Sequence, residues 1–115
     1  MASQLQPGEK LAVGASLMSP GERYTLTLQT DGNLVIYDEQ EHHLAIWSSA
    51  TNGKAVDHAI MQTDGNFVIY GFPQALWATN TVGQPGAFLV LQDDGHLAII
   101  QFFKQALWSA GTQGQ

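Results

Sequence analysis

The sequence contains no cysteine, which excludes disulfide bonds, cysteine-bound zinc and thiol catalysis together. It also carries little positive charge, since 4 lysines and arginines stand against 10 aspartates and glutamates. Binding to nucleic acid or to an acidic membrane surface needs clustered cations, so neither is expected as a partner. No apolar run approaches the roughly 20 residues of a membrane-spanning helix, so membrane insertion is not expected either.

The start of the chain, residues 1–10, is polar and lacks the apolar core of a signal peptide. Together with the absence of cysteine, this predicts a cytoplasmic protein or one exported by an unconventional route. A trimmed mature form carrying an added methionine would have the same sequence. At 115 residues the chain has the length of one domain, so we expect 1–115 to be a single domain.

The chain does contain an internal repeat. Three segments align: QTDGNLVIY from Gln29, QTDGNFVIY from Gln62 and QDDGHLAII from Gln92. Each is followed by a tryptophan in a similar context, at Trp47, Trp77 and Trp108, so all 3 tryptophans belong to the repeat. This pattern predicts three copies of one unit, at roughly 20–50, 54–80 and 85–110. We call them units one, two and three.

Each unit predicts a β-hairpin, because an Asp-Gly pair separates two short runs rich in apolar and β-branched residues. No stretch has helical periodicity. A three-residue loop, 30–32 in unit one, with Gly32 in the left-handed conformation, sorts the apolar residues onto one face. A two-residue loop would mix the faces. The predicted core residues are Leu26, Leu28, Leu34 and Ile36 in unit one, Ala59, Met61, Phe67 and Ile69 in unit two, and Leu89, Leu91, Leu97 and Ile99 in unit three.

One such sheet cannot bury its apolar face alone. Three sheets can bury their apolar faces against each other around a pseudo-threefold axis. The repeated tryptophans have apolar neighbours and are expected to fill this shared core. Stacking of a tryptophan on a sugar is the alternative.

The opposite face of units one and two alternates Gln, Asp, Asn, Val and Tyr. A saturated sugar ring presents hydroxyls that both donate and accept, together with apolar C–H patches, so this mixture suits a neutral sugar. Loss of one buried polar partner costs roughly 1–3 kcal/mol, which lets such a face distinguish epimers.

The spacing Gln-x-Asp-x-Asn-x-Val-x-Tyr resembles the signature of the bulb-type (monocot) mannose-binding lectin family. The three copies, the tryptophan after each copy and the run from Trp77 to Thr81 are similar to that family as well. The resemblance implies an all-β fold, the β-prism II of three antiparallel four-stranded sheets with pseudo-threefold symmetry. It also implies binding of terminal mannose or high-mannose glycans with no metal or other cofactor.

The resemblance further implies a role for each motif position. The glutamine bonds the 3-hydroxyl of mannose, the aspartate and asparagine hold its axial 2-hydroxyl, the valine contacts ring carbons and the tyrosine bonds the 4-hydroxyl. These residues are Gln29, Asp31, Asn33, Val35 and Tyr37 in unit one, and Gln62, Asp64, Asn66, Val68 and Tyr70 in unit two.

Unit three departs from the pattern. Gln92 and Asp94 match, whereas His96, Ala98 and Ile100 replace Asn, Val and Tyr. Because isoleucine cannot donate a hydrogen bond, we expect a degraded third site that is inactive or very weak. An altered specificity at His96 is the alternative.

Two further departures concern unit one. Plant members usually have a disulfide between the turn of the first motif and the following strand, and Gly32 and about Asp57 stand at those places. Unit one also has extra residues near 38–43, a loop that could shade or extend the first site. Adjacent histidines such as His42 and His43 rarely share one metal ion, so a solvated loop is expected there.

No catalytic constellation is evident. The repeat-equivalent Asp31, Asp64 and Asp94 should lie on separate sheets, so we expect no enzyme. The alternative function is that of a sugar-inactive structural or protein-binding member of the same fold, and the two intact motifs favour the lectin. The resemblance also implies a homodimer formed by exchange of C-terminal strands, which would use the segment 105–112.

Overall fold

Three small sheets make up the molecule. The computed structural model describes residues 2–101 and 106–110, which form three antiparallel sheets of four strands each. The first consists of β3 (Ser16–Met18), β4 (Tyr24–Leu28), β5 (Leu34–Asp38) and β6 (Leu44–Ser48). The second consists of β2 (Lys10–Ala12), β7 (Val56–Met61), β8 (Phe67–Gly71) and β9 (Ala75–Ala78). The third consists of β1 (Gln4–Leu5), β10 (Phe88–Leu91), β11 (Leu97–Ile100) and β12 (Ala106–Ser109).

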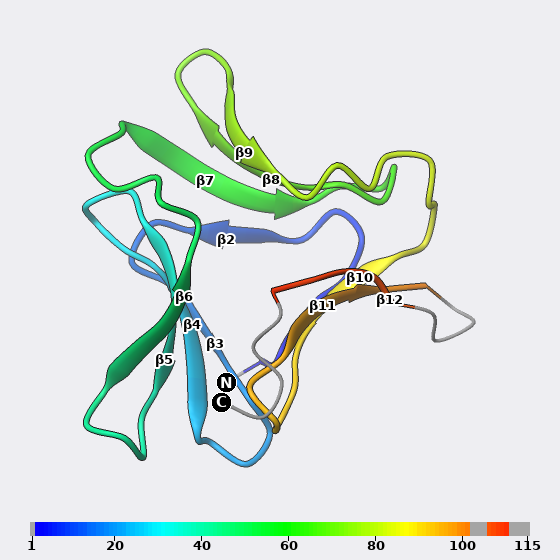
Figure 1. The fold of residues 1–115 in the computed structure, drawn as a ribbon. Helices are drawn as coiled ribbons and strands as arrows, with labels where there is room; N and C mark the ends of the chain where they lie inside the picture. The colour runs from blue at the N-terminus through cyan, green and yellow to red at the C-terminus, as the bar shows by residue number, and fades with distance from the viewer. Residues whose placement is uncertain (1, 102–105, 111–115) are drawn as a thin grey trace.

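The sheets face one another around a common centre, as the ribbon in Figure 1 shows. Every regular element in the described part of the chain is a strand, so the all-β prediction is confirmed. Over those same residues, no helix has the length and apolar character to cross a membrane.

The N-terminal segment supplies one strand to every sheet. β1 pairs with β10, β2 with β7 and β3 with β4, so each repeat unit contributes three consecutive strands and the segment adds the fourth. Each added strand buries one leucine, and Leu5, Leu11 and Leu17 are 3–5% exposed. Because a small sheet is only marginally stable alone, this segment ties the three units into one core.

The hairpin loops have the predicted length. Leu28 pairs with Leu34, and the Gln29 N–H donates to the Asn33 carbonyl at 2.8 Å, so three residues remain in the loop. Gly32 has φ +93°, in the left-handed region that a residue without Cβ adopts at little cost. The register therefore places alternate residues of β4 and β5 toward the core, as predicted.

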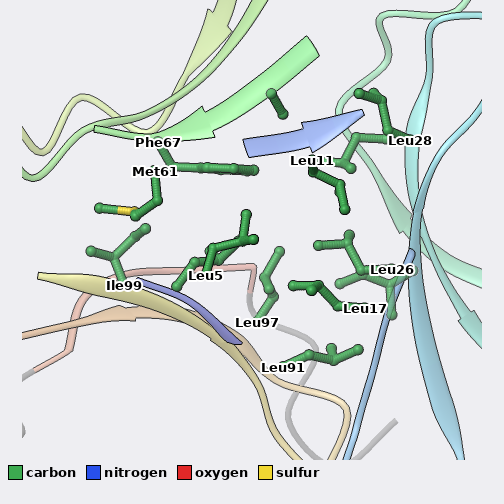
Figure 2. Packing of buried hydrophobic residues seen from close by; sticks show 14 of the residues in the cluster. Leu5, Leu11, Leu17, Leu26, Leu28, Met61, Phe67, Leu91, Leu97 and Ile99 are labelled. Carbon is green, nitrogen blue, oxygen red and sulfur yellow. The ribbon is translucent and has the colours of Figure 1, made fainter. Parts of the chain in front are cut away.

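The predicted inner-face residues form one continuous core, shown in Figure 2. The four residues predicted for each unit are all 0% exposed. Tyr24 and Ala87 join them, together with the three leucines of the N-terminal strands. Leu5, Leu17 and Leu97 lie in the middle of this packing, where side chains from different sheets meet. The core is thus shared by all three units, as the repeat requires.

The three tryptophans pack against this core and against one another. Their ring centroids are 5.7–5.8 Å apart and each pair meets edge to face, an arrangement that aromatic rings prefer. Trp47 pairs with Ile36 across the first sheet, and Trp77 and Trp108 have the equivalent partners Ile69 and Ile99. The rings are only partly buried, so they close one side of the core and are not fully enclosed by it.

Unit one contains an ion pair at the end of β5. The Arg23 guanidinium donates two hydrogen bonds to the Asp38 carboxylate, at 3.0 and 3.1 Å. Asp38 is 2% exposed, so it belongs to the sheet although the sequence placed it near the exposed loop. The hydrogen bonds from Arg23 hold the pKa of Asp38 below its usual range.

Candidate functional site

The five motif residues of unit one follow the outward face of the first sheet. Val35 and Tyr37 alternate with core residues on β5, Asn33 directly precedes that strand and Gln29 directly follows β4. Asp31 stands in the loop and is exposed, whereas Gln29, Asn33 and Tyr37 are half-buried. Val35 is 3% exposed, so it offers a ligand only a small apolar surface.

Unit two repeats this arrangement on the second sheet. Tyr70 lies on β8, Asn66 directly precedes that strand and Gln62 directly follows β7. Asp64 is exposed in the loop, and Val68 is 2% exposed. Each set of predicted site residues is therefore brought together within its own unit, and the two sets lie on different sheets.

The motif glutamine contacts the motif tyrosine in both units. Gln29 Nε2 donates to Tyr37 Oη, and the Gln62 amide bonds the Tyr70 hydroxyl. When the Gln62 nitrogen faces Asp64, it donates to the two carboxylate oxygens at 3.1 and 3.2 Å while Oε1 accepts from Tyr70. This orientation is the complementary one, because the reverse would set the amide oxygen against the carboxylate. In unit two, Gln62 thus links the hydroxyl and the carboxylate of its site.

The motif aspartate shapes the hairpin loop in all three units. One carboxylate oxygen accepts a hydrogen bond from the backbone N–H two residues later, a local turn that aspartate favours. The distances are 2.9 Å for Asp31 and Asn33, 3.0 Å for Asp64 and Asn66, and 2.9 Å for Asp94 and His96. Unit three therefore keeps its aspartate for a reason that is independent of any ligand.

The side-chain oxygen of the motif asparagine accepts hydrogen bonds from two buried Ser or Thr residues, which we call the hydroxyl pair. In unit one, Asn33 Oδ1 accepts from the Thr51 N–H at 3.2 Å and from Ser49 Oγ at 3.4 Å. In unit two, Asn66 Oδ1 accepts from the Thr81 N–H and from Thr79 Oγ1, both at 3.2 Å. With its oxygen occupied, each amide has only Nδ2 left to offer a ligand, and that group is a donor.

The residues of this hydroxyl pair were not predicted as part of the site. Thr51 Oγ1 donates to the Gly32 carbonyl at 2.6 Å, so the single Ser49 hydroxyl proton is shared between Thr51 Oγ1 at 2.8 Å and Asn33 Oδ1 at 3.4 Å. Thr79 and Thr81 make the same two bonds, to each other and to the Gly65 carbonyl. The sequence feature that could have identified them is a Ser or Thr at the second and fourth positions after Trp47 and Trp77.

Unit three lacks much of this arrangement. His96 takes the place of the asparagine, and its buried Nδ1 has no hydrogen-bond partner among the described residues. Ala110, whose N–H donates to the Leu97 carbonyl, takes the place of Ser49 and Thr79 but has no hydroxyl. Ala98 is 1% exposed, and Ile100 cannot bond a sugar hydroxyl.

A scan against models of protein families and a search of curated proteins both found no match. Solved structures, however, are similar to this chain over nearly its whole length. A monomeric monocot mannose-binding lectin from Gastrodia elata is 41% identical, covers 97% of this chain and 99% of its own, and has a TM-score of 0.87. The snowdrop (Galanthus nivalis) mannose-specific agglutinin, solved with methyl-α-D-mannoside, is 34% identical with 96% and 97% covered and a TM-score of 0.75. A domain-swapped lectin dimer from Mycobacterium smegmatis is 47% identical with 91% and 95% covered and a TM-score of 0.56.

The chain belongs to the bulb-type mannose-binding lectin family. Its three sheets are the β-prism II that the sequence resemblance implied. Its structural relatives are lectins, which bind carbohydrate and are not enzymes.

The loop of the first motif packs tightly against the segment that leads into unit two. A Cβ added at Gly32 would lie 2.9 Å from the Thr51 carbonyl oxygen and 3.3 Å from Val56 Cγ2, so the loop sits directly on the start of unit two. The nearest side chain to Gly32 is that of Val56, at the start of β7.

The histidines of the unit one loop do not form a metal site in the described structure. His42 and His43 are exposed, and His43 Nδ1 contacts Glu39 Oε1 at 2.5 Å. Across residues 2–101 and 106–110 no group of three or more possible metal ligands comes together. The extra residues instead bring His43 against the Tyr37 ring, with the two centroids 3.8 Å apart.

Proposed function

We propose that this lectin binds terminal mannose and mannose-containing glycans at units one and two, without a metal ion or other cofactor. The observation that carries the proposal is the recurrence of one polar arrangement on two separate sheets. An anchored asparagine, a turn-forming aspartate and a glutamine–tyrosine pair stand together in both. The relatives from snowdrop and from Polygonatum cyrtonema, 34% and 30% identical, were solved with a mannoside and support this choice of sugar.

The chemistry of each group suits one hydroxyl of mannose. Asn33 Nδ2 donates and the free Asp31 oxygen accepts, so together they suit the axial 2-hydroxyl. Gln29 bonds the 3-hydroxyl, Tyr37 bonds the 4-hydroxyl, and Val35 supplies the small apolar contact. Unit two uses its equivalent residues in the same way. In glucose the 2-hydroxyl is equatorial, so the asparagine and aspartate would lose their partner, at a cost of roughly 1–3 kcal/mol.

Unit three does not bind mannose in this proposal. The imidazole of His96 cannot replace the side-chain amide of the motif asparagine, in which the oxygen accepts from the protein and the nitrogen donates to the sugar. Ile100 has no hydroxyl to bond the sugar. Gln92 and Asp94 remain, but they lack the asparagine and the tyrosine that complete the proposed sites of units one and two. The lectin therefore presents two working sites and a third that serves the fold.

No catalytic activity is proposed for this lectin. Asp31, Asp64 and Asp94 stand in the hairpin loops of three different sheets, and each uses one carboxylate oxygen in its own turn. Paired carboxylates that hydrolyse a glycoside must flank a single bond.

The proposed assembly is a homodimer formed by exchange of C-terminal strands. In the described structure β12 pairs antiparallel with β11 of the same chain, so a partner's β12 would meet the same edge and the same register. The relative from Mycobacterium smegmatis is a domain-swapped dimer, whereas the one from Gastrodia elata is monomeric. Two weak sites per chain become four in a dimer, which raises avidity for multivalent glycans. Sedimentation of a monomer at micromolar concentration would contradict the dimer.

A titration with methyl α-mannoside, followed by calorimetry and by NMR of the loop amides, tests the function. We expect binding near millimolar, about −4 kcal/mol, at both sites. Methyl α-glucoside and methyl α-galactoside serve as controls and should bind at least tenfold more weakly. Tyr37→Phe and Tyr70→Phe should each weaken only their own site. A folded protein that ignores all three sugars would instead be a sugar-inactive member of the family.

A further inference from the structure

A histidine ring lies against the tyrosine ring of each proposed mannose site. In unit one, His43 stacks on Tyr37 with centroids 3.8 Å apart and planes 9° apart. In unit two, His58 stacks on Tyr70 with centroids 5.4 Å apart and planes 29° apart. Each histidine is also held by a carboxylate, since its Nδ1 contacts Glu39 at 2.5 Å or Asp57 at 2.7 Å.

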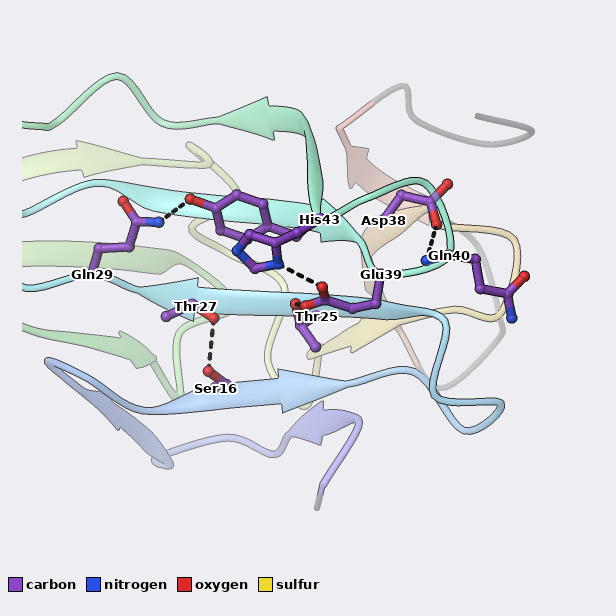
Figure 3. A network of polar contacts seen from close by, with 9 residues as sticks. Ser16, Thr25, Thr27, Gln29, Asp38, Glu39, Gln40 and His43 are labelled. Atoms are coloured by element: carbon purple, nitrogen blue, oxygen red, sulfur yellow. Dashed lines mark hydrogen bonds and ion pairs between the residues drawn. The ribbon is translucent and has the colours of Figure 1, made fainter.

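The histidine of unit one comes from the extra loop residues. His42 and His43 have φ values of +57° and +59°, and consecutive left-handed residues other than glycine are costly. Glu39 fixes the loop by accepting from Thr25 Oγ1 at 2.6 Å while it contacts His43. Figure 3 shows His43 beside Glu39 and Thr25. The ring on which His43 stacks is that of Tyr37, which Gln29 bonds. The two costly backbone conformations therefore lie in the loop that places the His43 ring against Tyr37.

The histidine of unit two comes from a different element. His58 lies on β7 directly opposite Tyr70, and Thr25 occupies the equivalent place opposite Tyr37 in unit one. In unit three that place holds Phe88, opposite Ile100. The stacked histidine thus accompanies the site tyrosine in the two units with intact motifs, although the chain supplies it in two unrelated ways.

We propose that His43 and His58 are positioning residues for the tyrosines of the two mannose sites, an inference that rests on the proposed function. A tyrosine on the outward face of a sheet must keep its hydroxyl beside both the glutamine and the sugar. A ring stacked on its face removes alternative rotamers, so less freedom is lost when the sugar binds. A ring pair of this kind corresponds to an affinity change of about two- to tenfold.

Matched substitutions test the role of His43. His43→Asn removes the ring but keeps a residue that tolerates the left-handed conformation. We expect methyl α-mannoside to bind unit one about two- to tenfold more weakly, as followed on the Gly32 and Asn33 amides. His43→Phe, which keeps a ring, should restore the affinity to within about twofold. His42→Asn makes the same change on the neighbouring exposed residue and should leave the affinity unchanged. Thermal unfolding of each variant reports any change in stability separately.

The parallel test in unit two uses His58→Thr, which installs the residue that unit one carries at the equivalent place. We expect a loss of about two- to tenfold on the Gly65 and Asn66 amides, with unit one unaffected. His58→Phe should retain binding. Wild-type affinity in both His43→Asn and His58→Thr would overturn the proposal. It would also be overturned if the phenylalanine variants bound as weakly as the ring-free ones.

Measurements on the sugar-free protein test the positioning role of the histidines independently of mannose binding. NMR relaxation and ring-current shifts of Tyr37 and Tyr70 report the order of the rings in the free protein. We expect His43→Asn to disorder Tyr37 and His58→Thr to disorder Tyr70, each without effect on the other. Unchanged tyrosine rings would overturn the positioning role. If the wild-type protein ignores mannoside but its tyrosines respond as expected, the sugar specificity fails while the positioning role stands.

Discussion

Units two and three close their hairpins in the same way and differ in what their outward faces can do. The hairpin of unit two closes with the Gln62 N–H donating to the Asn66 carbonyl at 2.8 Å, and unit three makes the equivalent bond from Gln92 to His96 at 2.9 Å. The inner faces are alike as well, since the four predicted core residues of each unit are 0% exposed. Only unit two has the anchored asparagine and the tyrosine.

The comparison shows that folding and binding make separate demands on the repeat. The inner face contributes to the core that all three units share and the aspartate turn shapes the hairpin, so a unit that loses them would also destabilise its neighbours. In the proposed function the outward asparagine and tyrosine serve a ligand, whereas the Thr79 hydroxyl also accepts a hydrogen bond from the buried Phe67 N–H. Unit three has His96, Ile100 and Ala110 in place of the asparagine, the tyrosine and this hydroxyl, and it still forms its sheet of the prism. Its Gly95 illustrates the constraint on folding, because a Cβ there would lie 2.8 Å from the ring of Tyr24 in unit one.

The comparison can be reversed by rebuilding unit three. The variant His96→Asn, Ala98→Val, Ile100→Tyr and Ala110→Thr copies unit two, and valine fits because Val35 and Val68 are also buried at the equivalent places. We expect a third mannoside site near millimolar, about −4 kcal/mol, detected as a third binding event in calorimetry and as shifts of the Gly95 amide. The same variant without Ala110→Thr should bind more weakly. A rebuilt unit that still ignores mannoside would show that the outward face alone does not make the site.

The opposite change makes unit two resemble unit three. Thr79 Oγ1 bonds the Phe67 N–H at 3.1 Å and Asn66 Oδ1 at 3.2 Å, and unit three has Ala110 at this place. We expect Thr79→Ala to lower the free energy of unfolding by about 1–3 kcal/mol, because it leaves a buried N–H without a partner. It should also weaken mannoside binding at unit two alone. Thr79→Ser is the control, since Ser49 does the same work in unit one. Unchanged affinity in Thr79→Ala would show that Asn66 does not need the Thr79 hydroxyl and that the Thr81 N–H holds it sufficiently.

The smallest expected effect concerns the ion pair of unit one, which units two and three lack because Gly71 and Gln101 stand in place of Asp38. Hydrogen bonds from Arg23 lower the pKa of Asp38 in the folded state, so its contribution to stability is present above its unfolded pKa. That contribution is lost as the pH falls below about 4, through the lower folded pKa. Urea unfolding from pH 7 to pH 2 should show the advantage of wild type over Asp38→Asn fading in this range. A pH-independent difference would contradict the assignment.

Much of the prism could be predicted from local patterns. Alternation around each Asp-Gly pair was enough to choose the three-residue loop and to name the core residues of all three hairpins, because these depend on residues adjacent in sequence. The distribution of β1, β2 and β3 over three different sheets could not be read from the residues, since each strand is only 2 or 3 residues long. β1 and β2 pair with β10 and β7, which lie far away in the chain, whereas β3 pairs with the next strand, β4.

The same division holds within the sites. The motif residues can be recognised from their spacing in the sequence. Ser49 and Thr51, which bond Asn33, follow it by 16 and 18 residues and lie beyond β6. His43 and His58 reach equivalent positions from a loop and from a strand, so no common spacing marks them.

The sequence by itself determined the repeat, the hairpin register, the inner faces and the difference between units one and two and unit three. These follow from side-chain chemistry and from the two-residue period of a strand, which act locally. Only the tertiary structure decided that the tryptophans meet edge to face, that Val56 packs against Gly32, and that a histidine stacks on each site tyrosine. Such contacts join residues that are distant in sequence, and they exist only once the three sheets have packed around one core.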